Sequence, residues 1–347
     1  MDIELKNNSS CHGNGTSCPG EFQHRSIHQI VVPLLDAVIF IIGVVGHTLV
    51  KVILIRRKKQ RRNGTNILLL NLSVADLLQL ACMPFNAASI ALARWVFGDF
   101  LCKAVSFVGV ACSSASVFTL AALAVNRYIT IVHPAKAYRF QLNWYFGMVI
   151  SIIWLPSVAL AVPQFVYRQT LMSDSDPVYC FAFLTDISQL VYCVALLLFS
   201  FAIPLIIIII MYSKIYCFLR AKKNSLHAPY LDTYHRKVTL VSVLLVLAFT
   251  ICWLPSYVLL FTLISSTVSF RGAFSIFAQL LAFSSTVANP ILYAFTSKKF
   301  RKELRALASP CCCCCGEQGQ DTVKPFHLEL QPHVDRKAHG FDTGRQK

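Results

Sequence analysis

Seven long apolar runs divide this chain of 347 residues. Each is long enough to cross the roughly 30 Å hydrocarbon core of a membrane as a helix, which takes about 20 residues. They lie near residues 30–55, 66–92, 101–132, 144–165, 188–218, 237–265 and 273–296. Charged residues make up only 14% of the chain, whereas soluble domains carry about 25%. The pattern predicts an all-α membrane protein, with a seven-transmembrane helix bundle over residues 30–296.

Basic residues predict the orientation of this bundle, because short cytoplasmic loops retain lysine and arginine. They gather after the first, fifth and seventh runs, in residues 56–62, 220–237 and 298–305, while the opposite loops hold only scattered bases. We therefore expect a multi-pass plasma-membrane protein with its N-terminus outside and its C-terminus inside. The net charge of +16 then reflects topology and contact with anionic lipid, not nucleic-acid binding.

The segments outside the bundle carry signals for modification. Residues 1–29 form a polar extracellular segment, with glycosylation sequons at Asn8 and Asn14. Residues 297–309 are expected to form a short amphipathic eighth helix, and residues 310–347 a cytoplasmic tail. The tail begins with Cys311, Cys312, Cys313, Cys314 and Cys315. Adjacent cysteines after a basic amphipathic segment favour palmitoylation, and five adjacent thiols cannot all reach one metal ion.

Cys102 and Cys180 both fall on the predicted outer side, where a disulfide persists. A bond between them would tie the loop before the fifth run across the entrance of the third helix. Cys11 and Cys18 are a second candidate pair, and the sequence leaves open whether they join.

Prolines interrupt the last three apolar runs. Each removes a backbone hydrogen bond and kinks its helix, so these helices are candidate hinges. Pro204 lies in the fifth run, Pro255 in the sixth and Pro290 in the seventh. The third run ends in Asn126-Arg127-Tyr128, and an arginine at the end of a membrane helix indicates a functional role.

Motifs on most of the seven runs resemble those of the rhodopsin-like (class A) G-protein-coupled receptors, over about residues 28–310. They are Leu70-Asn71-Leu72-Ser73-Val74-Ala75-Asp76, Asn126-Arg127-Tyr128, Trp154, Cys252-Trp253-Leu254-Pro255 and Asn289-Pro290-Ile291-Leu292-Tyr293. The resemblance implies a receptor that binds an extracellular ligand and activates heterotrimeric G proteins, and not an enzyme. We also find no catalytic constellation in the chain.

The resemblance assigns roles to residues of this sequence. Coupling to the G protein falls to Asn126, Arg127, Tyr128, Tyr212 and Tyr293. The activation switch comprises Phe249, Trp253, Pro204, Pro255, Asn289 and Pro290. A pocket for an allosteric sodium ion would be formed by His47, Asp76, Ser116, Ser285 and Asn289, with Asp76 as the carboxylate ligand to the metal. No other cofactor is implied.

Three departures from the family pattern have consequences. Asn126 replaces the acid that usually precedes the arginine, and the foot of the sixth helix offers His235 and Arg236, so we predict signalling without ligand. His47 stands where the family has asparagine, which leaves open a reshaped sodium pocket, pH-sensitive signalling or a tolerated replacement. The tail has few hydroxyls, chiefly Thr322 and Thr343, so arrestin recruitment should be weak.

The ligand class is predicted from what the outer half contains. Gly109 and Val110 stand where amine receptors place an aspartate, and Phe283 stands near the lysine of opsins. The long loop over residues 164–185 suits a peptide, and could form a hairpin lid. Candidate ligand contacts are Asn86, Trp95, Arg168, Gln189, Tyr192, Tyr257 and Gln279.

Further similarity points to the galanin, allatostatin and kisspeptin group of neuropeptide receptors. It rests on residues 118–133 and on Trp95-Val96-Phe97-Gly98. Ser256 and Tyr257 stand where two histidines are expected in a galanin receptor, which argues against galanin itself as the ligand.

Other functions stay open at this point. A lipid or small-molecule ligand is an alternative to the peptide. A decoy that binds its ligand without signalling is an alternative to the coupled receptor, because uncoupling would tolerate the changes at Asn126 and His47. A transporter or channel would place acids along several helices, whereas Asp36 and Asp76 are the conspicuous membrane acids here.

Overall fold

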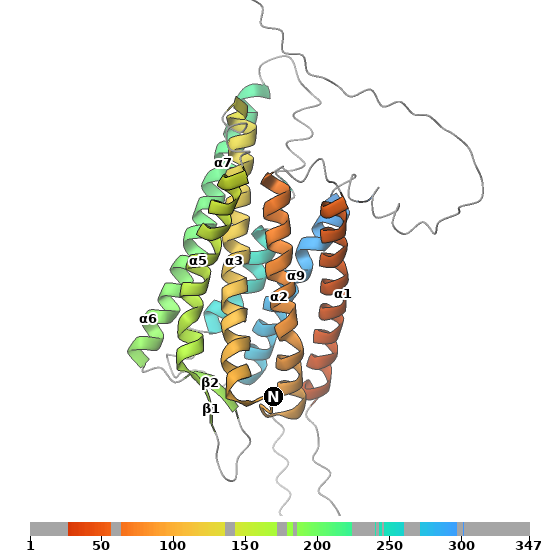
Figure 1. Cartoon of the computed structure of the whole chain (residues 1–347), viewed down its shortest axis with the longest axis vertical. Coiled ribbons are helices and arrows are strands. Elements are labelled where there is room, and N and C mark those ends of the chain that lie inside the picture. Colours follow the sequence, from red (N-terminus) through yellow and green to blue (C-terminus); the bar gives the residue numbers. More distant parts are fainter. Residues whose placement is uncertain are drawn as a thin grey trace, which may run out of the picture. The chain divides into compact units, whose positions relative to one another are not determined.

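The computed structural model describes residues 27–56, 64–135, 143–171, 179–182, 186–223, 246–259 and 271–296, with 240, 243, 244 and 301 (Figure 1). All of them belong to one compact unit, residues 1–307. The sequons at Asn8 and Asn14, the pair Cys11 and Cys18, the eighth helix and the tail with its cysteine run lie outside the described residues.

Helices account for almost all of the described chain. They are α1 (His28–Arg56), α2 (Gly64–Leu92), α3 (Gly98–Val132), α5 (Asn143–Tyr167), α6 (Asp186–Leu197), the π-helix η2 (Leu198–Ala202), α7 (Ile203–Lys223) and α9 (Arg271–Thr296). Because α6, η2 and α7 are continuous, six described helices are long and apolar enough to cross a membrane. A shorter apolar helix, Val246–Leu259, lies within the predicted sixth run. The predicted helical bundle is confirmed.

Helix α3 is at the centre of this bundle. It packs against α2, α5 and α7, and Figure 1 shows it between α2 and α5. Ala75 of α2 and Ala115 and Ala124 of α3 are fully buried in the core. Small side chains at such contacts let helix backbones approach closely in a membrane. On the other side of α2, α1 packs against α2 and α9.

Polar side chains join the helices where the sequence motifs lie. The Asn71 amide donates to the Thr119 hydroxyl oxygen at 2.8 Å, and the Trp154 indole N–H donates to Asn71 Oδ1 at 2.9 Å. Asn71 therefore bridges α2, α3 and α5. Interhelical hydrogen bonds of this kind stabilise bundles whose outer faces contact lipid, because the hydrophobic effect does not drive helices together inside a membrane.

A two-stranded hairpin covers one end of the bundle. Strand β1 (Arg168–Leu171) pairs antiparallel with β2 (Tyr179–Ala182), and Thr170 lies opposite Cys180. A disulfide joins Cys180 to Cys102 in the first turns of α3. The predicted disulfide and hairpin are both confirmed, and together they hold the start of β1 over α3.

The π-helix η2 interrupts the membrane span just before Pro204. Proline has no N–H, so it cannot donate to the carbonyl of Ser200 one turn earlier. The Ile203 N–H instead bonds the Leu198 carbonyl, five residues back. Single π-turns of this kind occur mostly as bulges inside α-helices, often at functional sites. The bulge places both Ser200 and Phe201 in buried positions.

Candidate functional site

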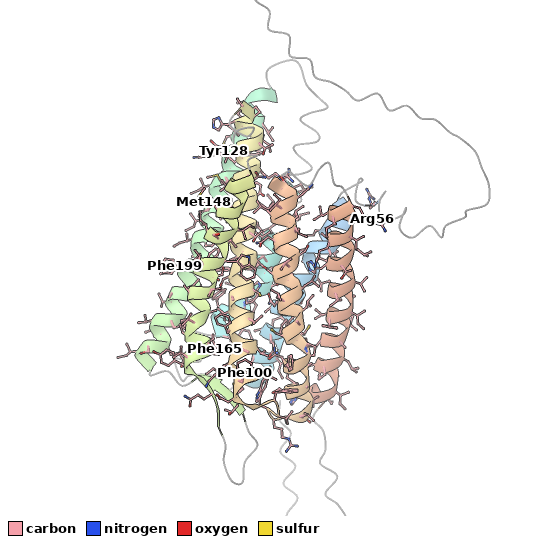
Figure 2. All side chains as sticks on the ribbon, viewed as in Figure 1. Arg56, Phe100, Tyr128, Met148, Phe165 and Phe199 are labelled. Carbon is pink, nitrogen blue, oxygen red and sulfur yellow. A yellow bond between two sulfur atoms is a disulfide. The ribbon has the colours of Figure 1, made fainter. Side chains whose placement is uncertain are left out.

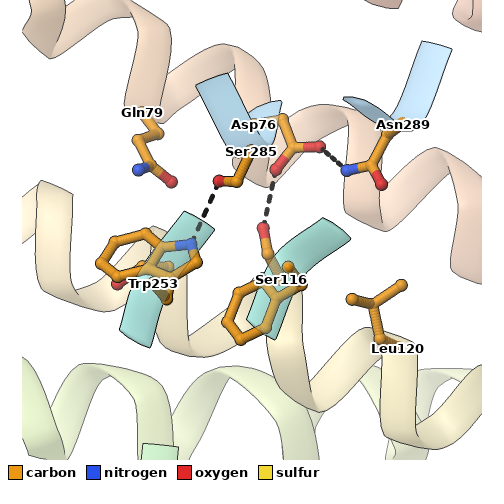
Figure 3. Close-up of a pocket in the computed structure, with 9 residues that line it drawn as sticks. Asp76, Gln79, Ser116, Leu120, Trp253, Ser285 and Asn289 are labelled. Carbon is orange, nitrogen blue, oxygen red and sulfur yellow. Dashed lines mark hydrogen bonds between the residues drawn. The ribbon is translucent and has the colours of Figure 1, made fainter. Parts of the chain in front are cut away.

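The Asp76 carboxylate is the centre of a buried polar site between α2, α3 and α9. Its side chain is only 2% exposed. Oδ1 accepts a hydrogen bond from the Ser116 hydroxyl at 2.8 Å, and Oδ2 accepts one from the Asn289 amide at 2.6 Å (Figure 3). A buried carboxylate is tolerated in a membrane helix when donors satisfy its oxygens. Ser116 and Asn289, which are far apart in the sequence, thus both contact the Asp76 carboxylate.

A small cavity adjoins this carboxylate. Its walls include Asp76, Gln79, Ser113, Ser116, Ser285 and Asn289, closed on one side by Leu120, Phe249 and Trp253. Carboxylate and hydroxyl oxygens are the ligands that hard cations prefer. The residues present therefore fit a sodium ion, with oxygens from Asp76, Ser116 and Ser285 facing the same space. Among the described residues, no group of three His, Cys, Asp or Glu side chains could hold a metal.

His47 lies on α1 behind the carboxylate. It is 1% exposed, and its Nε2 lies 2.7 Å from the Thr286 carbonyl oxygen, to which an N–H there donates. The same nitrogen is 3.5 Å from Asp76 Oδ2. Nδ1 is buried and has no hydrogen-bond partner in the described part of the chain. The imidazole therefore links α1 to α9 and adds a third donor-bearing group beside Asp76.

The aromatic residues of the predicted switch stack above this cavity. The Phe249 and Trp253 rings are 5.9 Å apart, and the Phe201 and Phe249 rings 6.4 Å apart. The Trp253 indole N–H donates to the Ser285 hydroxyl at 3.0 Å, as Figure 3 shows. Pro204 of α7 is fully buried and follows Phe201 by three residues. A movement of Trp253 must therefore break a bond to α9 at the rim of the cavity.

The opposite end of α3 carries the predicted coupling residues. The Asn126 amide donates to the Thr65 hydroxyl oxygen of α2 at 2.9 Å. Arg127 follows it, half-buried. The Tyr128 hydroxyl is 3.5 Å from His133 Nε2, and the Lys214 ammonium of α7 lies 5.8 Å from the Tyr128 ring centroid. Asn126 thus holds α3 to α2 through a neutral bond.

Tyr212 and Tyr293 differ in how far they are described. Tyr212 is buried in the main core cluster, on α7. The Tyr293 side chain, on α9, lies outside the described side chains. Pro255 is half-buried in the described part of the sixth helix, and Pro290 is buried on α9. A Cβ added at Gly46 would lie 2.8 Å from the Pro290 ring, so α1 and α9 approach each other closely there.

Three predicted ligand contacts come together at the hairpin end of the bundle. Arg168 donates from Nη1 to the Ser106 hydroxyl oxygen, and burial lowers the pKa of its guanidinium. Tyr192 donates to the Leu160 carbonyl at 2.9 Å and accepts from Gln164 at 3.4 Å. Tyr257 is buried in the same aromatic cluster as Tyr192, with its ring 4.9 Å from that of Phe201.

The other predicted ligand contacts are Asn86, Trp95, Gln189 and Gln279. The Asn86 amide bonds the Cys82 carbonyl of its own helix at 3.2 Å. Trp95 is buried, and its indole N–H donates to the Gly98 carbonyl at 2.8 Å, so it shapes the loop that enters α3. Gly98 there has φ +78°, which glycine adopts at no steric cost. Gln189 and Gln279 are half-buried on α6 and α9.

Several residues of the site were not predicted. Gln79 is 4% exposed and lines the cavity next to Asp76, and a polar residue three positions after a membrane acid is a signal that could have identified it. Ser114 and Ser200 are 2.7 Å apart between their hydroxyl oxygens. That pair depends on the π-bulge, and a serine within an apolar run does not reveal its partner.

Comparison with known proteins agrees with this geometry. The family model described as 7 transmembrane receptor (rhodopsin family) matches residues 46–293. The chain is 31% identical to the rat galanin receptor type 1 over 315 residues, which cover 87% of this chain and 90% of the relative. It is 32% identical to the human galanin receptor type 1, covering 82% and 83% of the two chains, and 32% identical to the human galanin receptor type 2, covering 87% and 79%.

The predicted relationship to the galanin group is therefore confirmed. Ser256 and Tyr257 still differ from the two histidines expected at these positions in a galanin receptor. Ser256 donates to the Ala278 carbonyl of α9 at 3.2 Å, and Tyr257 packs on Phe201, so in this chain both positions join helices. Receptors of this family are multi-pass plasma-membrane proteins that signal and are not enzymes. The chain belongs to the rhodopsin family of seven-transmembrane receptors and is related to the galanin receptors.

Proposed function

We propose that this protein is a receptor for an extracellular neuropeptide and activates heterotrimeric G proteins. The observation that carries the proposal is that the outer aromatic cluster includes Trp253, which bonds Ser285 of α9, and that both residues line the cavity beside the buried Asp76. A peptide that rearranges the outer cluster would move Trp253, which also lines the inner cavity. The relatives are named for a peptide, galanin, which supports the ligand class.

Activation is a shift between two populations of the bundle. A ligand shifts this equilibrium only by as much as it binds one population more tightly than the other. The π-bulge and Pro204 on α7, Pro255 on the sixth helix and Pro290 on α9 give these helices hinge positions. In the active population the cytoplasmic ends separate, and Arg127, Tyr212 and Tyr293 contact the G protein.

Orientation follows from the same proposal. The hairpin with the Cys102–Cys180 disulfide faces the outside, and the end of the bundle that carries Arg56 and Tyr128 faces the cytoplasm (Figure 2). Glycosylation at Asn8 and Asn14 and palmitoylation of Cys311–Cys315 fit this orientation. The tail, with few hydroxyls, supports only weak arrestin recruitment.

Sodium is proposed as an allosteric ion at the cavity. Asp76, Ser116 and Ser285 would hold it, and a bound cation neutralises the carboxylate charge inside the bundle. Asn289 and Ser116 orient the carboxylate by donating to its two oxygens. His47 Nε2 of α1 lies 3.5 Å from Asp76 Oδ2. Sodium should therefore favour the population in which α2, α3 and α9 stay together.

The test of the function is activation of each G-protein class in cells that express the chain, challenged with galanin and a panel of neuropeptides. Arg127→Ala at matched surface level is the control, since it removes the cation at the cytoplasmic end. A peptide response that Arg127→Ala abolishes supports a coupled receptor. Specific peptide binding with no activation of any class would identify a decoy and sink the proposal.

Raised basal activity is the finer part of the proposal. An acidic residue before Arg127 would pair with the arginine and stabilise the inactive population, whereas the Asn126 amide donates its hydrogen bond to Thr65. We expect Asn126→Asp to lower ligand-free G-protein activation several-fold, since a partly exposed ion pair stabilises by about 1 kcal/mol. Thr65→Val, which removes the hydroxyl that accepts from Asn126 and leaves Asn126 uncharged, is the matched control. Equal basal signal from wild type and Asn126→Asp would contradict this part alone.

A further inference from the structure

Arg168 is a cation at the outer end for which the described residues provide no anion. It begins strand β1, directly after α5. Its Nη1 donates to the Ser106 hydroxyl, a neutral acceptor that itself donates to the Cys102 carbonyl at 2.9 Å. Its Nε is buried without a hydrogen-bond partner in the described part of the chain. The guanidinium is thus only partly satisfied.

The described carboxylate next to this strand is already used. Asp99 accepts from the Thr170 N–H at 3.0 Å and pairs with the Lys103 ammonium at 2.5 Å. Removing a charge from water without a counter-ion costs several kcal/mol, and arginine stays protonated in proteins. A buried donor that the fold leaves without an acceptor therefore needs an explanation outside these residues.

The surroundings of Arg168 suit a bound group. The disulfide and the hairpin register hold β1 over the start of α3, so the guanidinium is placed before a ligand arrives. Phe165 packs edge-on against Phe107 at 6.0 Å and against Phe100 at 6.4 Å, and Figure 2 places Phe165 and Phe100 at the hairpin end. Arg168 as a whole residue is half-buried, and its Nε is buried.

We propose that Arg168 is the anchor for a carboxylate of the ligand, and that this receptor selects peptides that carry one. The inference rests on the proposed peptide function. A guanidinium binds a carboxylate through two parallel N–H···O bonds, which are stronger than bonds to neutral acceptors. The carboxylate belongs either to an aspartate or glutamate side chain or to a free C-terminus, and both offer the same two oxygens.

Three small probes test the preference on the purified full-length receptor. They are acetyl-Phe-Glu-amide, with a side-chain carboxylate, acetyl-Phe-Gln with a free C-terminus, and acetyl-Phe-Gln-amide, with neither. We expect at least one acidic probe to bind about tenfold more tightly than the neutral one, as a charged hydrogen-bonded pair allows. The acidic probe that binds more tightly identifies the source of the carboxylate.

Variants show whether Arg168 causes that preference. Arg168→Gln should remove it, while Arg94→Gln, the same change at an exposed outer position, should keep it. An acidic preference that survives Arg168→Gln, or equal binding of all three probes by wild type, would overturn the proposal. Neither result would touch the proposed function, because peptide-driven activation of G proteins is measured separately.

A ligand-free measurement tests the main rival, an acid of this chain's own loop. Asp174 and Asp176 lie outside the described residues, between the two strands. If Arg168 awaits a ligand, Arg168→Met should leave the melting temperature of the purified receptor unchanged or raise it. A fall that Asp174→Asn with Asp176→Asn reproduces, with no further fall in the triple variant, would assign the anion to the loop and overturn the proposal.

Discussion

Replacing Cys102 or Cys180 with serine should cut the amount of receptor at the cell surface at least several-fold and remove the peptide response. The bond closes a loop with a sequence separation of 78 residues, and loss of such a constraint costs about 4 kcal/mol in the chain-entropy model. That is a large part of the 5–15 kcal/mol, roughly, by which domains are stable. It also removes the covalent link between the hairpin that contains Arg168 and the start of α3.

The measurement is antibody labelling of intact cells, followed by G-protein activation at matched surface level. The double variant Cys102→Ser with Cys180→Ser separates the missing bond from the effect of one unpaired thiol. Cys217→Ser, at an exposed free cysteine of α7, controls for the change of residue type. Normal surface level and an unchanged peptide response in the double variant would contradict this account of the outer end.

Replacing Asp76 with alanine should lower the stability of the receptor by about 3 kcal/mol, because two buried donors lose their acceptor and each unsatisfied group costs 1–3 kcal/mol, roughly. Those donors are the Ser116 hydroxyl and the Asn289 amide. The apparent melting temperature of the purified protein reports the loss. Any effect of sodium on that temperature should vanish in the same variant.

Asp36 offers a matched control for this change. It is also a buried acid in a membrane helix, 1% exposed, but neither of its carboxylate oxygens has a hydrogen-bond partner among the described residues. Asp36→Ala should therefore leave the melting temperature unchanged or raise it, since it removes a buried polar group without orphaning a donor. A similar fall in both variants would mean that hydrogen bonding to Asp76 is not what stabilises the bundle.

The sequence predicted those parts of the molecule for which physical constraints allow only one arrangement. A chain in lipid must satisfy its own backbone, so apolar runs of sufficient length become helices, and the observed helices lie within a few residues of the predicted runs. Cys102 and Cys180 could be paired because compartment and motif order agreed. Asp76 could be placed beside Asn289 through the family resemblance alone, since 213 residues separate them.

The parts that were missed depend on rotation of one helix against another. Asn126 was interpreted only through the charge it lacks, and its bond to Thr65 follows from how α2 faces α3. The ligand contact of Trp95 stays a prediction, but the bond from its indole N–H to the Gly98 carbonyl was not predicted. A single side chain at an outer helix end does not indicate which neighbour it will face, because several orientations bury it equally well.

The π-bulge has a consequence for how residues of the fifth span are counted. Two stripes of buried residues meet in the bulge. Ile208, Tyr212 and Ile215 on its C-terminal side continue the stripe of Phe201, and Cys193 and Leu196 on its N-terminal side continue the stripe of Ser200. The two stripes are out of phase by one residue, or about 100° of rotation. A helical wheel counted outward from Tyr212 would select Val194 and Leu190, which are 37% and 42% exposed. An alignment with any receptor that lacks the extra residue needs a one-residue gap here, or the positions beyond it are assigned to a face about 100° away from the one they occupy.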